Sequence, residues 1–197
     1  MSLAVAVVFA RIPRLGVGKR RLAREAGDRA ALNFARHNLL RLLRRLRGLR
    51  GVELVLAAAP DLHARFAAPG FRRIGQGRGD LGVRMQRIFN RFPRRRVVLV
   101  GSDIPGIQAA DIRAALRRLR GAAAVFGPAA DGGYWLVGLS GRRVAAPFAR
   151  VRWSSPYALA DTLCNLPRRE AAFLRRLSDV DDAASLRAAM LASPLQR

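Results

Sequence analysis

The segment Arg96–Pro105, RVVLVGSDIP, joins a strand to a polar turn and is the best starting point for inferring the fold. Residues 97–100 form a valine-rich run without polar alternation, which is typical of a strand covered on both faces. Gly101, Ser102 and Asp103 follow directly. Because ligands of open α/β sheets bind beyond the carboxyl ends of the strands, this segment predicts a buried parallel sheet with a polar site beside it.

Similar segments occur on both sides of this strand. Further strands are predicted at Leu3–Phe9, Val52–Ala58, Ala122–Phe126 and Tyr134–Leu139, with a short segment near Phe71–Ile74. Helices are predicted at about 28–47, from the glycine-rich 75–82 segment through Phe89, and at 111–119, 156–163 and 183–191. This alternation predicts an α/β fold, a three-layer α/β/α sandwich with a mostly parallel central sheet. A chain of 197 residues is expected to form a single domain, 1–197.

The net charge of +24 raises the question of a nucleic-acid partner. The arginines are scattered along the whole chain, so they indicate a positive surface rather than a specific nucleic-acid site. The helix at 28–47 carries Arg41, Arg44 and Arg45 between its leucines and could bind RNA or a membrane. Packing of the leucine face on a sheet, with the arginines in water, is the favoured interpretation.

The apolar runs are too short for a membrane span, which needs about 20 residues. We therefore expect no membrane span, no signal peptide and a cytoplasmic location. Cys164 is the only cysteine, which excludes an internal disulfide. Small-molecule substrates, no specific nucleic acid, and a monomer or homodimer are the expected partners and assembly.

The loop after the first strand contains Lys19, the only lysine among 37 basic residues. It is not a Walker A loop, because Pro13 stands where the first glycine is needed and Arg20 stands where serine or threonine is needed. The loop also does not match the dinucleotide-binding fingerprint, because Arg21 stands where the third glycine is needed. Gly16 and Gly18 could bring backbone N–H groups near an anion, with Lys19 and Arg21 beside them. We therefore predict that this loop binds phosphate.

Acidic residues are few and gather after strands. Asp103 follows the 97–100 strand, Asp131 begins Asp-Gly-Gly, and Asp179 and Asp181 lie two residues apart. Carboxylates at strand ends are suited to Mg²⁺, which proteins hold with one or two carboxylates plus substrate phosphates. Helix caps or ion pairs with arginine are the expected roles of three other aspartates, Asp111, Asp161 and Asp182. No cysteine or glutamate stands at zinc-ligand spacing from the two histidines. The sequence also lacks the G-x-S-x-G pattern of serine hydrolases.

Several motifs in series resemble DUF2064, a bacterial family also described as radical-SAM/selenodomain-associated transferases, within the nucleotide-diphospho-sugar transferase (GT-A) superfamily. The matching residues span nearly the whole chain: Phe9, Pro13 to Leu22, Gln76 to Met85, Gly101 to Pro105, Gly127 to Tyr134, Trp153 to Ser155 and Asp179 to Asp182. The sequence departs from the family pattern at Arg20, Trp135, Ser155 and Asp182. The resemblance implies a GT-A fold.

The resemblance also implies site roles. Phe9, Gly16, Gly18, Gln76, Gly79 and Ser102 would bind the nucleotide together with Lys19 and Arg21, and Gln76 would lie near the base. Asp103 and Asp181 would hold Mg²⁺ or Mn²⁺, and the catalytic residues would be Lys19, Arg21 and Asp103. Asp131, Gly132, Gly133, Tyr134 and Trp153 would face the acceptor.

Two reactions fit this superfamily. A nucleotidyltransferase must neutralise a leaving pyrophosphate, to which Lys19 and Arg21 are suited, and it is slightly favoured, with a small phosphorylated or anionic acceptor. Transfer of a sugar from a nucleotide-sugar donor is the alternative. A basic RNA- or membrane-binding module without catalysis is a further alternative, which leaves the Asp-Gly motifs without a purpose.

Overall fold

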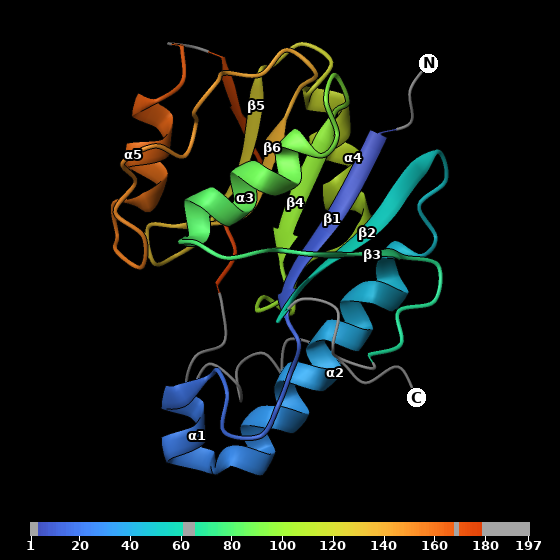
Figure 1. The fold of residues 1–197 in the computed structure, drawn as a ribbon, viewed down its shortest axis with the longest axis vertical. Helices are drawn as coiled ribbons and strands as arrows, with labels where there is room; N and C mark the ends of the chain where they lie inside the picture. Colours follow the sequence, from blue (N-terminus) through green and yellow to red (C-terminus); the bar gives the residue numbers. More distant parts are fainter. Residues whose placement is uncertain (1–3, 61–65, 168–169, 179–197) are drawn as a thin grey trace.

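The computed structural model describes residues 4–60, 66–167 and 170–178. Seven of the described segments are strands of one sheet (Figure 1). They are β1 (Ala4–Arg11), β2 (Val52–Ala59), β3 (Arg72–Gly75), β4 (Val97–Gly101), β5 (Ala124–Pro128), β6 (Tyr134–Leu139) and β7 (Ala171–Phe173). The described helices are α1 (Arg20–Ala26), α2 (Asp28–Leu46), α3 (Leu81–Asn90), α4 (Ala109–Arg118) and α5 (Ala158–Cys164).

The sheet has the order β3-β2-β1-β4-β6-β5-β7. Strand β1 pairs in parallel with β2 and β4, and β2 pairs in parallel with β3. Strand β6 runs antiparallel between β4 and β5, and β5 pairs in parallel with β7. The carboxyl ends of β1, β4 and β5 therefore meet at one edge, where the polar turns were expected.

The central strands are buried on both faces. In β1, Ala6 and Val8 belong to one apolar cluster, whereas Val5 and Val7 belong to a second cluster on the other face. The first cluster includes buried residues of α2 and α4, and the second includes those of α3. The side chain of Leu163 on α5 also packs against the second cluster. The sheet therefore lies between two helical layers, which confirms the three-layer α/β/α sandwich.

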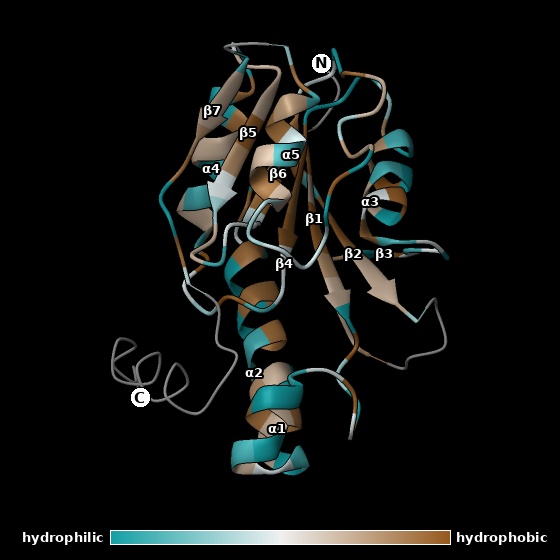
Figure 2. Cartoon of the chain, turned by 90° about the vertical axis from the view of Figure 1, so that its left-hand side faces the viewer, coloured by the Kyte–Doolittle hydropathy of each residue, from teal (hydrophilic) through white to brown (hydrophobic). Residues whose placement is uncertain are grey.

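Helix α2 packs on the sheet only with its second half. Its buried residues are mainly Leu39, Leu42, Leu43 and Leu46, whereas the first half is largely half-buried or exposed. Figure 1 shows that α1 and the start of α2 extend beyond the carboxyl edge of the sheet. In Figure 2 the central strands and much of α2 are brown, whereas α1 and parts of α3 are teal.

Two short elements differ from the sequence prediction. Helix α1 and strand β7 have seven and three residues, and both are too short for a clear apolar period. The predicted loop at 10–19 begins later, because β1 continues to Arg11. The helix predicted at 183–191 lies outside the described residues. None of the described helices combines the length and the apolar composition needed to cross a bilayer.

Candidate active site

A cleft of about 450 Å³ opens at the carboxyl edge of the sheet. This volume is within the usual range for small-molecule sites. Residues from β1, β4, the β5–β6 turn, α3 and the segment before α5 line it: Phe9, Arg11, Gln76, Leu81, Arg84, Met85, Leu99, Gly101, Ser102, Asp103, Ile104, Ala129, Asp131, Gly133, Tyr134, Trp135, Val137, Trp153, Ser154, Ser155 and Ala158.

Side chains from α2 fix the loop that carries Asp103. The buried Asn38 amide donates a hydrogen bond of 2.6 Å from Nδ2 to the carbonyl oxygen of Ser102. Arg45 Nη1 donates to the carbonyl oxygens of Pro105 and Ile107, at 2.5 and 3.1 Å. Burial, together with the nearby charge of Arg41, lowers the pKa of the Arg45 guanidinium below its usual value. Arg45 therefore holds the active-site loop, whereas the sequence placed it on a solvent-facing basic surface.

Arg175, which follows β7, fixes the other end of the same loop. Its Nη2 donates to the carbonyl oxygen of Gly106 at 2.8 Å and to Asp111 Oδ2 at 2.8 Å, and its Nε donates to Asp111 Oδ1 at 2.9 Å. Asp111 Oδ2 also accepts from the backbone N–H of Gln108 at the start of α4. Asp111 thus has the expected role of a helix cap with an arginine partner.

The turn between β5 and β6 brings Asp131 to the cleft. Asp131 is exposed, and its Oδ1 accepts a hydrogen bond of 2.9 Å from the backbone N–H of Gly133. Gly132 has a φ of 86°, and a β-carbon there would come within 2.2 Å of the carbonyl oxygen of Pro156. Gly132 does not line the cleft, and its close packing against Pro156 gives a structural reason for glycine at this position.

Gln76 lies fully buried at the end of β3 and presents an arginine to the cleft. Its Nε2 donates to the carbonyl oxygens of Ala10 and Ala57, at 3.0 and 2.8 Å, so both amide hydrogens are used within the protein. Its Oε1 accepts from Arg84 Nη2 at 2.5 Å. The Arg84 guanidinium lies 5.3 Å from the centre of the Phe9 ring. These contacts hold the Arg84 guanidinium against one wall of the cleft.

Aromatic side chains form another wall. The rings of Tyr134 and Trp153 meet edge to face with centroids 6.4 Å apart. Burial raises the pKa of the Tyr134 phenol above its usual value, although a hydrogen bond with Thr162 opposes the shift. Tyr134 therefore stays neutral and does not serve as a base near neutral pH. Gly82 allows Trp153 to approach α3, since a β-carbon there would lie 3.0 Å from the indole.

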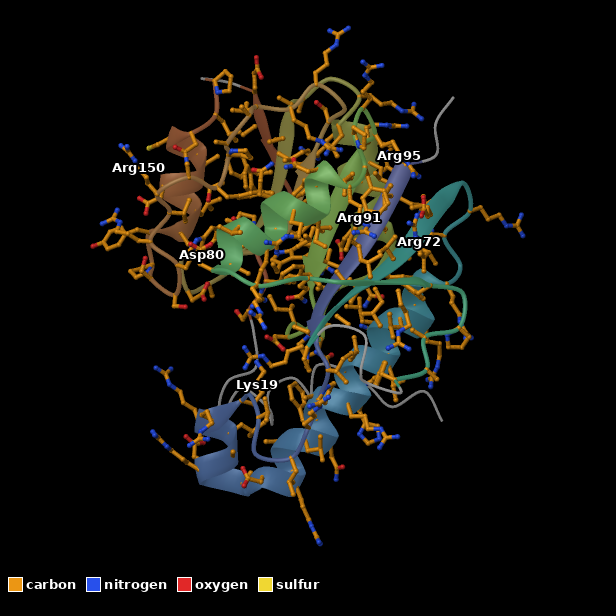
Figure 3. The ribbon with its side chains drawn as sticks, in the orientation of Figure 1. Lys19, Arg72, Asp80, Arg91, Arg95 and Arg150 are labelled. Atoms are coloured by element: carbon orange, nitrogen blue, oxygen red, sulfur yellow. The ribbon has the colours of Figure 1, made fainter. Side chains whose placement is uncertain are left out.

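The structure brings eight of the predicted site residues into this cleft: Phe9, Gln76, Ser102, Asp103, Asp131, Gly133, Tyr134 and Trp153. Six others do not line it: Gly16, Gly18, Lys19, Arg21, Gly79 and Gly132. Lys19 lies at the start of α1, beyond the edge of the sheet (Figure 3). The loop turns there because Lys19 has a φ of 44° and the following helix buries Leu22. Asp181 lies outside the described residues.

The donor atoms in the cleft fit a divalent cation. Asp103 and Asp131 are exposed carboxylates that line the same cavity. Within the described ranges, no three histidine, cysteine, aspartate or glutamate side chains form a cluster that could hold a metal by themselves. Two carboxylates completed by substrate phosphates are the usual arrangement for Mg²⁺, so the residues present are compatible with a metal held jointly with the substrate.

Sequence reasoning missed several residues of the site. Arg84 stands within the quoted Gln76–Met85 motif, and Arg11 ends the first strand, but neither differs from the many other arginines of this chain. Asn38, Arg45 and Arg175 act on the Asp103 loop from positions more than 55 residues away in the sequence. A polar residue at a core-facing position of a leucine-rich helix is the one pattern that could have revealed Asn38.

A family model described as an uncharacterized protein conserved in bacteria (DUF2064) matches residues 42–155. This span is more than half of the chain and contains most of the cleft. The chain belongs to DUF2064. A comparison with curated protein sequences finds no match.

Several solved structures with this fold are named as transferases. One of them is a protein of Desulfovibrio desulfuricans G20, provisionally named a nucleotide-diphospho-sugar transferase, with 27% identity and a TM-score of 0.89 over 100% of this chain and 90% of that chain. A cytidylyltransferase for 2-C-methyl-D-erythritol 4-phosphate from Thermus thermophilus has 13% identity and a TM-score of 0.60, over 99% and 100% of the two chains.

Glucosyl-3-phosphoglycerate synthase of Mycobacterium tuberculosis, in complex with Mn²⁺, UDP and glucosyl-3-phosphoglycerate, has 13% identity and a TM-score of 0.55. The match covers 95% of this chain and 76% of that chain. At this identity, the likeness to the synthase and to the cytidylyltransferase shows a shared fold alone. The DUF2064 chain therefore has the GT-A-like fold of nucleotidyl and glycosyl transferases.

Proposed function

We propose that this DUF2064 protein is a metal-dependent nucleotidyltransferase, which moves a nucleotidyl group from a nucleoside triphosphate to a small phosphorylated or anionic acceptor. The observation that carries the proposal is that two carboxylates, Asp103 and Asp131, and two guanidinium groups, Arg11 and Arg84, line one cleft. Such a set is suited to a triphosphate, since the carboxylates share a cation with the phosphates and the arginines bind phosphate oxygens directly.

Each group has a proposed task. Asp103 and Asp131 would hold Mg²⁺ or Mn²⁺, with Asp181 as a further ligand; this cation neutralises phosphate charge when bound. Arg84, fixed by Gln76, would orient the phosphate chain. Lys19, at the end of the loop after Arg11, and Arg21, in the first turn of α1, would contact the leaving pyrophosphate. Gly16, Gly18 and Gly79 would shape the nucleotide site. Because the strands that border the cleft belong to one sheet, we expect a single-domain enzyme.

The reaction would proceed by displacement at phosphorus. An acceptor oxygen forms a bond to the α-phosphorus while the bond from that phosphorus to the bridging oxygen breaks, and pyrophosphate leaves with that electron pair. An acceptor oxygen that is already ionised needs no base. A reaction without a base is consistent with Tyr134, because burial raises the pKa of its phenol and keeps it neutral. Tyr134 and Trp153 would instead exclude water from the acceptor side.

Glycosyl transfer is the second candidate, and the aromatic wall favours it. The edge-to-face pair of Tyr134 and Trp153 offers an apolar surface on which the carbon face of a sugar ring could pack. The fold match with the D. desulfuricans protein also supports this candidate.

Binding and product analysis test the proposal. Calorimetry would measure the binding of the four common nucleoside triphosphates and of nucleotide-sugars in the presence of Mg²⁺ or Mn²⁺. Pyrophosphate release from a triphosphate would support nucleotidyl transfer, whereas release of a nucleoside diphosphate from a nucleotide-sugar would show glycosyl transfer. Failure of every nucleotide to bind would refute both reactions.

A further inference from the structure

A second pocket lies between the edge strand β3 and helix α3. Its volume is about 330 Å³. Among the described residues, those that line it include four arginines and no acidic side chain: Arg72, Arg73, Ile74, Gly75, Gly77, Arg87 and Arg91. We call it the arginine pocket. Figure 3 shows Arg72 and Arg91 near one another and far from Lys19, so this pocket is separate from the basic loop predicted from the sequence.

Among the described residues, one carboxylate forms an ion pair with an arginine of the pocket. Glu53 of β2 is the carboxylate beside it, and its oxygens pair with Arg72 Nη1 at 3.3 Å and with Arg95 Nη1 at 2.6 Å. Burial would raise the pKa of Glu53, but hydrogen bonds and charges from Arg95 and Arg72 hold it below its usual value. One carboxylate is thus shared between two guanidinium groups, one of which lines the pocket.

Arg87 and Arg91 also line the pocket, and a hydrogen bond holds Arg87 in place. Arg87 Nη1 donates to the carbonyl oxygen of Gln76 at 2.7 Å, which fixes the guanidinium at the pocket wall. Arg91 is the C-cap residue of α3, one turn after Arg87, and it is exposed. Like charges four residues apart on a helix repel one another, and a bound anion would relieve that repulsion.

The arginine pocket is a different site from the active-site cleft. Gly75 and Gly77 line the pocket, whereas Gln76 between them lines the cleft, so the two cavities lie on opposite sides of this one segment. The carboxylates of the cleft, Asp103 and Asp131, do not line the pocket. A divalent cation is therefore not expected there, and an anion would bind through guanidinium groups alone.

We propose that the arginine pocket is a binding site for a small anion that carries phosphate groups, separate from the donor in the cleft. Guanidinium groups bind phosphate oxygens in bidentate pairs, and a pocket of about 330 Å³ lined by Arg72, Arg87 and Arg91 suits a compact anion with more than one phosphate. Single-stranded nucleic acid is less suitable, because its bases need aromatic platforms and Ile74 is the one large apolar side chain among the described lining residues.

The test uses inorganic pyrophosphate as the probe, at constant ionic strength and with a chelator that removes divalent cations. Calorimetry on the full chain would compare the parent with Arg87→Gln/Arg91→Gln. The matched control is Arg113→Gln/Arg117→Gln, which removes the same charge at the same spacing from exposed positions on α4, on the opposite face of the sheet. We expect one saturable site whose affinity falls about tenfold or more in the first variant and less than about twofold in the control.

Three results would overturn the proposal. Equal weakening in both double variants would show that only the overall charge matters. Loss of the pyrophosphate site in Arg84→Gln, with binding intact in Arg87→Gln/Arg91→Gln, would assign the anion to the cleft. Displacement of pyrophosphate by an oligonucleotide, with affinity that grows with its length, would assign the surface to nucleic acid. Arg91→Gln alone, at an exposed position, keeps the test valid if the double variant does not fold. None of these results depends on whether the cleft transfers nucleotidyl groups.

Discussion

Two loops at the same edge of the sheet show how differently this fold treats similar sequences. The loop after β4, which carries Asp103, is held by Asn38, Arg45 and Arg175 through four carbonyl oxygens. The loop after β1 instead turns outward between Arg11 and Lys19, through glycines of positive φ, and leads into α1. Both contain glycine and a charged residue, yet the first lines the cleft and most of the second does not. The hydrogen bonds from Asn38, Arg45 and Arg175 hold the first loop at the cleft.

Neutralising the carboxylate of the anchored loop has the largest expected effect. Asp103→Asn should lower turnover by about 10²- to 10³-fold, because one oxygen ligand for the cation becomes a neutral amide. Measurements of turnover across a range of Mn²⁺ concentrations, together with thermal unfolding, would check this. Asp28→Asn, an exposed aspartate in the first turn of α2, is the control. Full activity in Asp103→Asn would remove the reason to place the reaction in this cleft.

The second-largest expected effect is a loss of stability when a hydrogen bond that holds the Asp103 loop is removed. Asn38→Leu keeps the volume but leaves the carbonyl oxygen of Ser102 without this donor, at a cost of about 1–3 kcal/mol. Urea unfolding would measure the loss. Asn33→Leu, at an exposed position of the same helix, is expected to change stability by less than about 0.5 kcal/mol. Equal effects in both variants would mean that the hydrogen bond to Ser102 does not stabilise the loop.

The outward loop is tested by Lys19→Arg. This change keeps the charge but replaces a compact ammonium with a planar fork, so turnover should fall about tenfold if Lys19 reaches the leaving phosphates. Stability should stay within about 0.5 kcal/mol, since the change keeps the positive charge at this half-buried position before α1. Steady-state kinetics and unfolding would be measured on the same preparation. Unchanged turnover would refute the proposed catalytic role of Lys19 and confine the site to the described cleft.

The smallest expected effect concerns the segment that carries Trp153. Asp161 accepts hydrogen bonds from the backbone N–H and the guanidinium of Arg152, which lower the pKa of its carboxyl from 3.8 to about 2. The folded-state pKa is the lower one, so this stabilisation is present above pH 3.8 and is lost as the pH falls toward 2.

Unfolding at about pH 5 and about pH 2.5 would check this dependence. The difference in stability between the parent and Asp161→Asn should shrink at the lower pH, with Asp28→Asn as the control. A constant difference would mean that the ionised carboxyl of Asp161 makes no contribution.

The arginines of helix α2 have different roles, which affects the choice of mutations. The sequence places Arg41, Arg44 and Arg45 together on one charged surface. In the structure, Arg45 binds carbonyl oxygens of the Asp103 loop, whereas Arg41 and Arg44 are exposed. Neutralising all three would therefore damage the cleft as well as the charged surface. Arg41→Gln/Arg44→Gln tests an RNA- or membrane-binding role without that complication.

The layered fold and the location of the cleft could be predicted from the sequence alone. Valine-rich runs such as 97–100 specify strands buried on both faces, since a chain with no polar alternation has no face for water. The position of Asp103 directly after such a strand then follows from local order in the sequence.

Only the tertiary structure decided which charged residues serve the cleft. Among the 37 basic residues, Arg84 lines it because Gln76 holds its guanidinium, and Arg45 faces inward because a loop about 60 residues away offers two carbonyl oxygens. Arg87 and Arg91 join Arg72 because the end of α3 and the edge strand β3 line the same pocket. Hydrogen bonds between distant segments depend on how the elements pack. Because arginines occur throughout the sequence, no local pattern shows which of them form such bonds.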